Sequence, residues 1–539
     1  MIKIASNFLE RAINELKNTN FKSKNPLIIQ AEQISISKDE INELLAQARE
    51  YFVSPLSKTP FCIKRGDKVL IERNLRVLRD ESTYFVLKAL NSFESSKDGG
   101  ILAFISNNGF IDNATARAFR FWLMQNLDEI YILNLHGNTR KREYDAQGAV
   151  DENPFSLMNG ASISVFVKKS PQKSLEKLAD VYCCDILGSR ARKLEFLQKA
   201  SLKSENFIKI NPHEPYFFFN NDSKQNENYC KFYGIADIFD IHGSGIQSGN
   251  DSLLVAMDEL GLKAKISTHY GSFNPKSVQK IMYRPYDLRY VYYDNKIQRP
   301  RTTLMRHLLG RNNLALHVSR QAKLSGAWDF CFVSEILTQR CLLGGGNTGA
   351  GIIWPLYVYD QNGNASSNIG LFFLEKLSKI CGREISPKDA FCYIYATLNH
   401  KIYRTKYENE LKLDFARVPL PKDDKCFEKL CDLGSKLIDT QLLKNLKAVN
   451  FEYKREKNDE ISSNPLYAKG GIFINSSLFY PCKIDVWQWS IGGGSVLVRY
   501  LKARKGLKLD KEYFGILISL ASRSLELIEQ ISAVSFAEF

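Results

Sequence analysis

One short stretch of the 539-residue chain, Asn153-Pro154-Phe155, has residue types that could do chemistry on a nucleobase. Enzymes that methylate adenine in DNA carry Asn/Asp-Pro-Pro-aromatic. The Asn side chain and a backbone carbonyl hold the adenine amino group, and the ring stacks on the flipped base. The stretch here has a single proline. The alternative is an ordinary turn, for which Asn and Pro are equally typical, so the other motifs must decide.

A second group of residues could bind DNA. The segment YRPYDLRYVYYDNKIQRPRTTLMRHLLGR, residues 283–311, mixes arginines with five tyrosines. Arginine can donate two hydrogen bonds to a phosphate or to guanine, and tyrosine can donate a hydrogen bond to a phosphate or stack on an exposed base. Alternatively, Arg284 and Arg289 pair with acids such as Asp287, and the rings belong to a core. For any single residue we favour pairing, and for the cluster as a whole we favour DNA.

Glycine clusters could cradle a cofactor. The sequence DIHGSGIQSGND, residues 240–251, contains Gly-Ser-Gly, the core of the S-adenosylmethionine loop in adenine methyltransferases. That loop needs an Asp or Glu four residues before its first glycine, but Phe239 stands there and Asp240 comes one residue late. We therefore favour a structural or DNA-facing loop over a cofactor site. The glycines at 342–351 and 491–495 lack the Gly-Lys-Ser/Thr of a phosphate cradle and are expected to form loops or turns.

Composition narrows the class of protein. Lys plus Arg number 74 against 59 Asp plus Glu, so the formal charge is +15 and favours a polyanionic partner. Eleven cysteines without a C-x-x-C spacing and seven dispersed histidines imply no metal site, and we expect reduced, mostly buried thiols. The sequence contains no run of eighteen apolar residues that would predict a membrane span. We therefore expect a cytoplasmic location. Neither a Gly-x-Ser-x-Gly elbow nor a magnesium-binding nuclease array is found.

Hydrophobic spacing predicts the elements that must position these residues. Helices are expected over 37–52, where Ser37 and Glu40 form a capping box, and over 78–93. From Gly99 the pattern changes to a buried strand at 99–106, a helix at 110–127 capped by Asp112 or Asn113, and buried strands at 128–135 and 161–169. This order predicts the closing half of a parallel α/β sheet.

After residue 173 the pattern is mixed. Short aromatic strands are expected at 214–220 and 290–295, and an exposed loop at 361–368. Helices are expected at 390–411 and, as an amphipathic C-terminal helix, at 512–531.

Several of these stretches, in order, resemble one family of enzymes. They include GGILAFISNNGFIDNATARAFRFWLMQNL, DENPFSLMNGASISVFVKK, GSGIQSGND, YRPYDLRYVYY, YIYATLNHKIYRTKYENEL and VWQWSIGGGSVLVRYLKARKG. From about Leu78 to the C-terminus the chain resembles type ISP and related single-chain restriction-modification enzymes, in their adenine methyltransferase and target recognition regions. In that family the catalytic Asn-Pro-Pro-Tyr precedes the strand that matches Gly99 onward. The resemblance therefore implies that Asn153-Pro154-Phe155 is a turn.

The resemblance also implies a domain plan. Residues 1–77 form an N-terminal helical segment of uncertain role, and 78–172 the second half of a Rossmann-like methyltransferase sheet. Residues 173–539 form a mixed α/β target recognition domain with a helical C-terminus. Double-stranded DNA is the expected partner. The residues expected to contact it are Arg284, Arg289, Arg299, Arg301, Arg306, Arg320, Lys323, Arg404 and Lys406.

The chemistry of the family is not accounted for by this chain. Its cofactor loop and catalytic loop should precede Gly99, and residues 1–98 contain neither. We therefore expect no catalytic residue and no cofactor bound by this chain alone. S-adenosylmethionine would serve the complete enzyme, through a separate N-terminal methyltransferase/nuclease polypeptide.

Two alternatives stay open. One is an active, divergent adenine methyltransferase that has recruited the loop at Gly243. The other is an inactive remnant of a split gene. Half of a parallel sheet would expose an unpaired edge, which predicts poor solubility unless a partner chain or the first ninety residues cover it.

Overall fold

A computed structural model describes residues 2–20, 26–30, 62–65, 68–71, 81–94, 96, 98–139, 143–145, 147–169, 177–204, 206–214, 216–220, 227–320, 327–344, 351–454, 459–475 and 477–535. The chain divides into two compact units, Met1–Gln225 and Asn226–Phe539. Each is described by itself, and the three-part division expected from the sequence stays a prediction. The helix expected at 37–52 lies outside the described residues.

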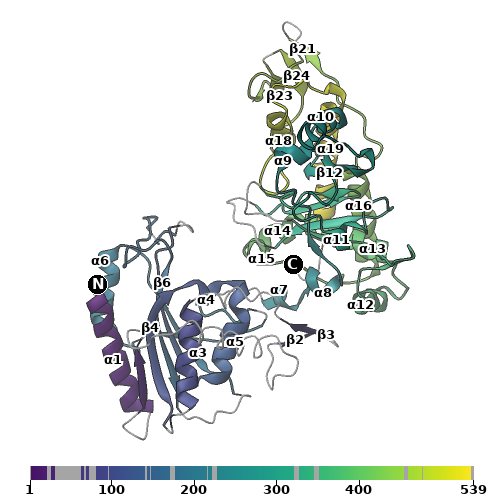
Figure 1. Cartoon of the computed structure of the whole chain (residues 1–539). Coiled ribbons are helices and arrows are strands. Elements are labelled where there is room, and N and C mark those ends of the chain that lie inside the picture. The colour runs from purple at the N-terminus through teal and green to yellow at the C-terminus, as the bar shows by residue number, and fades with distance from the viewer. Residues whose placement is uncertain are drawn as a thin grey trace. The chain divides into compact units, whose positions relative to one another are not determined.

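Unit 1 is built on a six-stranded mixed sheet in the order β1-β4-β6-β5-β7-β8 (Figure 1). Its strands are β1 (Leu27–Gln30), β4 (Gly100–Asn107), β5 (Glu129–His136), β6 (Ala161–Lys168), β7 (Asp180–Asp185) and β8 (Ile208–Ile210), and β2 (Cys62–Arg65) pairs separately with β3 (Lys68–Ile71). The helical elements are α1 (Ile2–Asn20), α3 (Glu81–Glu94), α4 (Gly109–Asp112), the 3₁₀ turn Ala114–Ala116, α5 (Arg117–Asn126) and α6 (Arg190–Lys199). The strands expected at 99–106, 128–135 and 161–169 and the helices expected at 78–93 and 110–127 are confirmed.

The sheet differs from the expected parallel one at β6. This strand runs antiparallel to both of its neighbours, β4 and β5. The reason lies in the connections: α5 carries the chain from β4 back to the start of β5, whereas the segment between β5 and β6 contains no helix in its described residues. Without a crossover helix the chain returns in the opposite direction.

The outer edge of β4 is paired within the chain. The short strand β1 lies parallel to β4, with Leu27 opposite Gly100 and Gln30 opposite Ala103. The first ninety residues therefore cover the strand edge that would otherwise be open, one of the two ways of covering it that the sequence predicted.

Helices cover both faces of the sheet because β4 is apolar on both faces. Leu102 and Phe104 pack in one core cluster with residues of α3 and α5. Ile101 and Ala103 alternate with them and pack in a second cluster with residues of α1 and α6. Figure 1 shows α1 on one side of the sheet and α3 with α5 on the other. Unit 1 is thus a helix–sheet–helix sandwich.

The aromatic strand expected at 214–220 is wrong. In its described residues this segment is irregular, with Phe217 at a φ of 52°. Its carbonyls are taken by the fully buried Arg120, whose Nε donates to Phe217 O over 2.8 Å and whose Nη2 donates to Tyr216 O over 2.6 Å. The positive φ of Phe217 is incompatible with a strand, and the contacts with Arg120 hold the segment in this irregular form, so tertiary contacts override the strand propensity of the rings.

Unit 2 contains three four-stranded sheets in its described residues. The sheet orders are β10-β17-β14-β15, β11-β13-β12-β16 and β21-β24-β23-β22. Their strands are β10 (Gly243–Ser244), β11 (Val255–Ala256), β12 (Val278–Arg284), β13 (Asp287–Tyr292), β14 (Ala315–Ser319), β15 (Cys331–Ser334), β16 (Leu337–Thr338), β17 (Gly351–Pro355), β21 (Glu452–Tyr453), β22 (Leu466–Ala468), β23 (Gly471–Ile474) and β24 (Leu478–Pro481). Two-stranded pairs join β9 (Tyr233–Gly234) to β20 (Arg417–Val418) and β18 (Tyr357–Tyr359) to β19 (Ala365–Ser367).

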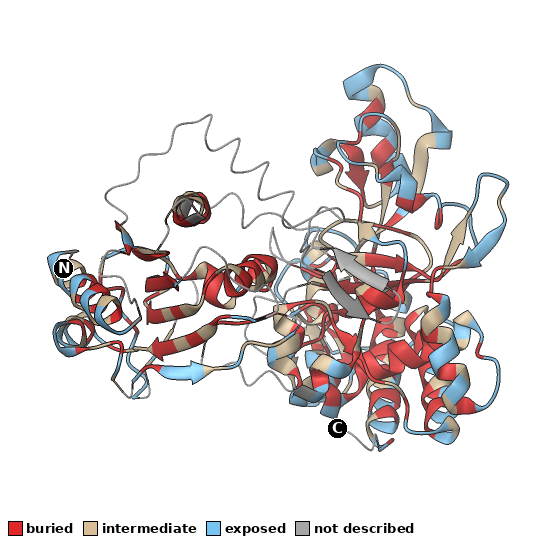
Figure 2. Cartoon of the chain, turned by 90° about the horizontal axis from the view of Figure 1, so that it is seen from below, coloured by how far each residue is buried: buried red, intermediate tan, exposed pale blue. Residues whose placement is uncertain are grey.

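Helices carry most of the core of unit 2. They are α7 (Glu227–Lys231), α8 (Ile235–Ile238), α9 (Asp251–Leu254), α10 (Glu259–Tyr270), α11 (Thr302–Met305), α12 (Leu371–Cys381), α13 (Pro387–Asn399), α14 (Lys401–Lys406), α15 (Glu408–Leu413), α16 (Asp424–Gln441), α17 (Ile484–Gln488), α18 (Val496–Ala503) and α19 (Lys511–Ser532). α13, α16 and α19 pack against one another, and their buried residues belong to one core cluster. Figure 2 shows how buried and exposed residues are distributed over the chain. The helices expected at 390–411 and 512–531 and the strand at 290–295 are confirmed, the first broken at His400 and Tyr407. The loop expected at 361–368 is the tip and second strand of the β18–β19 hairpin.

The expected mixed α/β architecture with a helical C-terminus is therefore confirmed. The cysteines from Cys183 to Cys482 are free thiols, buried or half-buried, as expected. Among the described helices, none combines the length and apolarity needed to span a bilayer.

Candidate nucleic-acid interface

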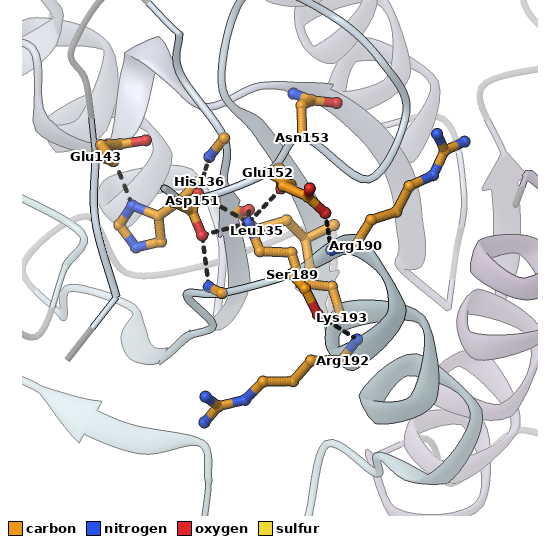
Figure 3. A network of polar contacts seen from close by, with 12 residues as sticks. Leu135, His136, Glu143, Asp151, Glu152, Asn153, Ser189, Arg190, Arg192 and Lys193 are labelled. Atoms are coloured by element: carbon orange, nitrogen blue, oxygen red, sulfur yellow. Dashed lines mark hydrogen bonds and ion pairs between the residues drawn. The ribbon is translucent and has the colours of Figure 1, made fainter. Parts of the chain in front are cut away.

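The Asn153-Pro154-Phe155 stretch is a turn, as the sequence predicted (Figure 3). Asn153 is buried, and its Oδ1 accepts hydrogen bonds from the backbone N–H groups of Phe155 and Leu157 at 2.8 and 3.2 Å. Its Nδ2 donates to Asn159 O over 2.7 Å. Both ends of the amide are therefore used to hold the turn, and neither is free to grip a base.

A buried ion pair fixes this turn to its neighbours. Lys193 and Asp151 have fully buried side chains, and the Lys193 Nζ lies 2.8 Å from the Asp151 carboxylate. The same Nζ donates to the carbonyl oxygens of Leu135 and Glu152 at 2.6 and 2.7 Å. Asp151 in turn accepts from the backbone N–H groups of Gly137 and Gly188 (Figure 3). Burial lowers the pKa of Lys193. The hydrogen bond and the negative charge of Asp151 act in the opposite direction but do not fully offset this effect.

We expect Lys193→Met to destabilise unit 1 by about 3–5 kcal/mol, because it leaves the Asp151 carboxylate buried without its cation. Hydrogen exchange measured on peptides from β5 and β6 reports this unit separately. The control is Lys199→Met on the same helix, where an exposed pair with Glu195 is removed, with an expected change within about 0.5 kcal/mol. Equal exchange rates in the two variants would contradict a structural role for the buried pair.

His136, at the end of β5, lies between two carboxylates. One ring nitrogen is 2.9 Å from Asp185 Oδ1, and the other is 3.3 Å from Glu143 Oε1. Burial by itself lowers the pKa of His136, but the hydrogen bonds to Asp185 and Glu143 outweigh it and raise the pKa to about 9. The imidazolium is thus held as a cation that ties the start of the 137–160 segment to β7.

This pair of contacts predicts a pH dependence of stability. Because the folded-state pKa of His136 is raised, its contribution is complete below pH 6.5 and is lost as the pH rises through about 9. The melting temperature of the wild-type chain should therefore fall more between pH 6 and pH 10 than that of His136→Gln. Equal falls would show that the two carboxylates do not stabilise the charged imidazole.

In unit 2, three segments meet in a junction that we define as residues 246–248, 298–299 and 338–340. The segment 246–248 is hydrogen-bonded to each of the other two segments. Ile246 N donates to Thr338 O over 2.9 Å and Arg340 N donates to Ile246 O over 2.8 Å. On the other side, Gln247 and Arg299 exchange two backbone hydrogen bonds of 3.1 and 3.0 Å. The junction is therefore a small patch of extended backbone on which side chains are held in fixed positions.

Glycines make the junction possible. A Cβ on Gly245 would lie 2.6 Å from Thr338 O and 2.9 Å from Arg340 N, so only glycine allows the two segments to approach so closely. Gly249 has a φ of 85°, a conformation that other residues rarely adopt. Packing therefore explains the second glycine of the Gly-Ser-Gly motif, because backbone atoms of 338–340 fill the space beside Gly245.

Side-chain contacts of Asp251 and Tyr283 stabilise the segment 246–248 of the junction. The Asp251 carboxylate accepts from the hydroxyls of Ser248 and, over 2.7 Å, of Tyr283. The Tyr283 ring is covered on its faces by guanidinium groups, with Arg289 at 3.9 Å and Arg284 at 4.5 Å from the ring centre. These contacts hold the 248–251 turn against β12.

Three of the arginines expected to bind DNA are available to a ligand. Arg299, Arg301 and Arg306 are exposed, and none of their guanidinium groups has a partner within the described residues. Arg299 belongs to the junction, and the other two follow it at either end of α11. Lys406 is also exposed, with its ammonium 5.6 Å from the Tyr407 ring centre.

The other predicted residues have partners in the protein. Arg289 pairs with Asp287 over 2.7 Å, as the alternative interpretation predicted. Arg284 donates to Gln339 Oε1 over 3.0 Å rather than to an acid. Arg320 pairs with Asp414 over 2.9 Å, and Arg404 donates to Leu398 O and Asn399 Oδ1. Lys323 lies outside the described residues.

The sequence analysis missed the polar side chains that accompany Arg299. Gln247, Gln298 and Arg340 lie together on the junction, with Gln247 bonded to both of the others. The available signal was that each is the polar residue beside an apolar or glycine-rich stretch, in GSGIQSG, NKIQRP and LTQRC. Only the backbone bonds between the segments show that three segments far apart in the sequence share one surface.

The glycines at 491–495 form a turn, as expected. Arg499 donates to Ile491 O and Gly492 O at 2.8 and 2.7 Å, and Asp329 accepts from Gly493 N over 2.7 Å. The glycine cluster at 342–351 lies partly outside the described residues.

Residues 259–514 match the model of the Type ISP C-terminal specificity domain. The predicted resemblance to type ISP enzymes is therefore confirmed over this segment, which is similar to the C-terminal specificity domain of those enzymes. Among curated proteins, none matches the sequence at a significant level.

Solved structures share the fold. The structure of the ATP-dependent Type ISP restriction-modification enzyme LlaBIII bound to DNA has a TM-score of 0.64 at 19% identity, and the match covers 95% of this chain and 37% of that one. For the DrdV–DNA complex the TM-score is 0.63, at 17% identity, with coverages of 94% and 57%. For a nuclease-deletion mutant of the Type ISP enzyme LlaGI with a DNA substrate mimic it is 0.60, at 18%, with coverages of 97% and 54%. The chain thus spans between 37% and 57% of the length of these structures.

The close approach at Gly245 leads to a prediction. Gly245→Ala should destabilise unit 2 by about 1–3 kcal/mol, because its methyl group overlaps the backbone of 338–340. Thermal unfolding measures the loss. Gly351→Ala is the matched control, since a Cβ there would meet its nearest neighbour, Leu343, at an ordinary 3.4 Å. A Gly245→Ala protein as stable as this control would mean that the junction is looser than described.

Proposed function

We propose that this chain recognises a specific sequence in double-stranded DNA as part of a restriction-modification system. The observation that carries the proposal is the junction of 246–248, 298–299 and 338–340, next to or within a segment that matches a specificity domain. Glutamine and arginine are the side chains that read adenine and guanine in the major groove. The relatives solved in complex with DNA support DNA as the ligand.

The basic segment 259–311, which includes residues 298–299 of the junction, supplies the sequence-independent part of binding. Residues 259–311 carry eleven Lys or Arg against three Asp or Glu. Of these, Arg299, Arg301 and Arg306 project without internal partners, so we assign them to phosphates, with Lys406 as a further candidate. The arginines that pair within the protein are assigned to holding the surface in shape.

Replacing Arg299 and Arg301 together by alanine tests this assignment. Duplex binding at low salt should weaken by roughly tenfold or more, because two charge-assisted contacts are lost. The slope of log affinity against log salt should fall by about two, one per phosphate contact. Fluorescence anisotropy of a labelled duplex, titrated at several salt concentrations, measures both quantities.

The control for this experiment is Arg523→Ala on α19, where an exposed arginine pairs with Glu526. It removes surface charge away from the junction segments and should leave the salt slope nearly unchanged. An unchanged affinity and slope in the double variant would remove Arg299 and Arg301 from the interface.

We further propose that the complete system methylates adenine with S-adenosylmethionine, and that a separate N-terminal methyltransferase/nuclease polypeptide supplies the cofactor and catalytic loops. The Gly243–Gly245 loop does not support a cofactor site in this chain, because Gly245 is packed against the backbone of 338–340. The test is transfer of a labelled methyl group to unmethylated duplex DNA. No transfer by this chain, and transfer after adding the N-terminal polypeptide, is the expected result. Incorporation into adenine by this chain alone would contradict it.

A further inference from the structure

Three side chains of the junction form a directed chain of hydrogen bonds. Arg340 Nη1 donates to Gln247 Oε1 over 3.1 Å. Gln247 Nε2 then donates to Gln298 Oε1 over 2.8 Å. Both bonds run in the same direction, from the guanidinium toward the amide of Gln298, so each amide oxygen already accepts a bond from inside the chain.

The direction of these hydrogen bonds determines which donor and acceptor groups remain free to bind a ligand. Arg340 retains Nε and Nη2, and Gln298 retains Nε2, with no partner for these groups among the described residues. All of them are donors. The Arg340 end of this row of hydrogen bonds therefore presents only donors and favours a ligand that offers acceptors.

The backbone positions the three side chains before any ligand arrives. Arg340 N donates to Ile246 O, Gln247 is bonded on both backbone groups to Arg299, and Gln298 N donates to Ser248 O over 3.0 Å. Arg340 and Gln247 are half-buried while Gln298 is exposed. A guanidinium held by a fixed amide loses less conformational freedom on binding than a free arginine does.

We propose that Arg340 reads a guanine in the DNA site, with Gln247 as the residue that positions its guanidinium. This rests on the proposed DNA-recognition function. Guanine presents two acceptors, O6 and N7, to the major groove, which match the two donors that Arg340 keeps. Adenine presents an amino group in the place of O6 and would set donor against donor, and thymine presents only one acceptor beside its methyl group.

The test replaces single atoms of the DNA. The duplex preferred by the full chain is first selected from a random pool, and each of its guanines is then replaced in turn by 7-deazaguanine, which lacks the N7 acceptor. For the wild-type chain we expect one replacement among them to weaken binding by about tenfold through the contact with Arg340. For Arg340→Gln, the same replacement should have no further effect, while the effects at other guanines remain.

Two further variants separate specificity from general affinity. Arg306→Ala, which removes an exposed arginine outside the junction, should weaken all duplexes alike and keep the sensitivity to the deaza replacement. Gln247→Leu should reduce that sensitivity although Arg340 is present, and Gln247→Glu, which keeps the acceptor for Arg340, should restore it.

The outcomes distinguish the inference from the proposed function. If Arg340→Gln stays sensitive at every guanine at which the wild-type chain is sensitive, or if the selected site contains no guanine, the inference is wrong and DNA recognition stands. If no sequence is enriched by the folded wild-type chain, both are wrong.

Discussion

The backbone contact between 246–248 and 338–340 is the constraint on which the recognition surface depends. It brings the segment that follows β10 against residues 338–340 at the end of β16, at a distance that only Gly245 permits. Once this contact forms, the bonds between Gln247 and Arg299 add the third segment. Polar side chains from three distant parts of the sequence then share one surface without any of them being on a long loop.

In unit 1, a buried ion pair and not a close backbone approach holds distant segments together. There a buried lysine, Lys193, gathers two backbone carbonyls and the Asp151 carboxylate, and Asp151 in turn gathers two N–H groups. Breaking such a pair leaves an uncompensated charge in the interior, so the arrangement has one stable form. The segment between β5 and β6 is thereby kept in shape, and the Asn-Pro-Phe turn within it has a structural role.

The sequence predicted the elements better than their contacts. Apolar runs and caps predicted β4, β5, β6 and α5, because burial and capping act over a few neighbouring residues. The hydrophobic pattern does not predict that β6 is inserted antiparallel or that β1 pairs with β4. It also does not predict that Arg120 donates to the carbonyls of residues 216–217. These depend on contacts between segments far apart in the chain. The same holds for the site: Arg299, Arg301 and Arg306 were found as charges in a basic stretch, whereas Gln247 and Arg340 become partners only through the fold.

The most direct test of the central claim is selection of duplex DNA from a random pool by the purified full chain, followed by sequencing of what it retains. The account predicts that one short asymmetric sequence is enriched over successive rounds and is bound much more tightly than its scrambled form. Retention of DNA without enrichment, by a protein shown to be folded, would contradict it. In that case the basic surface would bind DNA by charge alone, and the ordered polar junction would need another explanation.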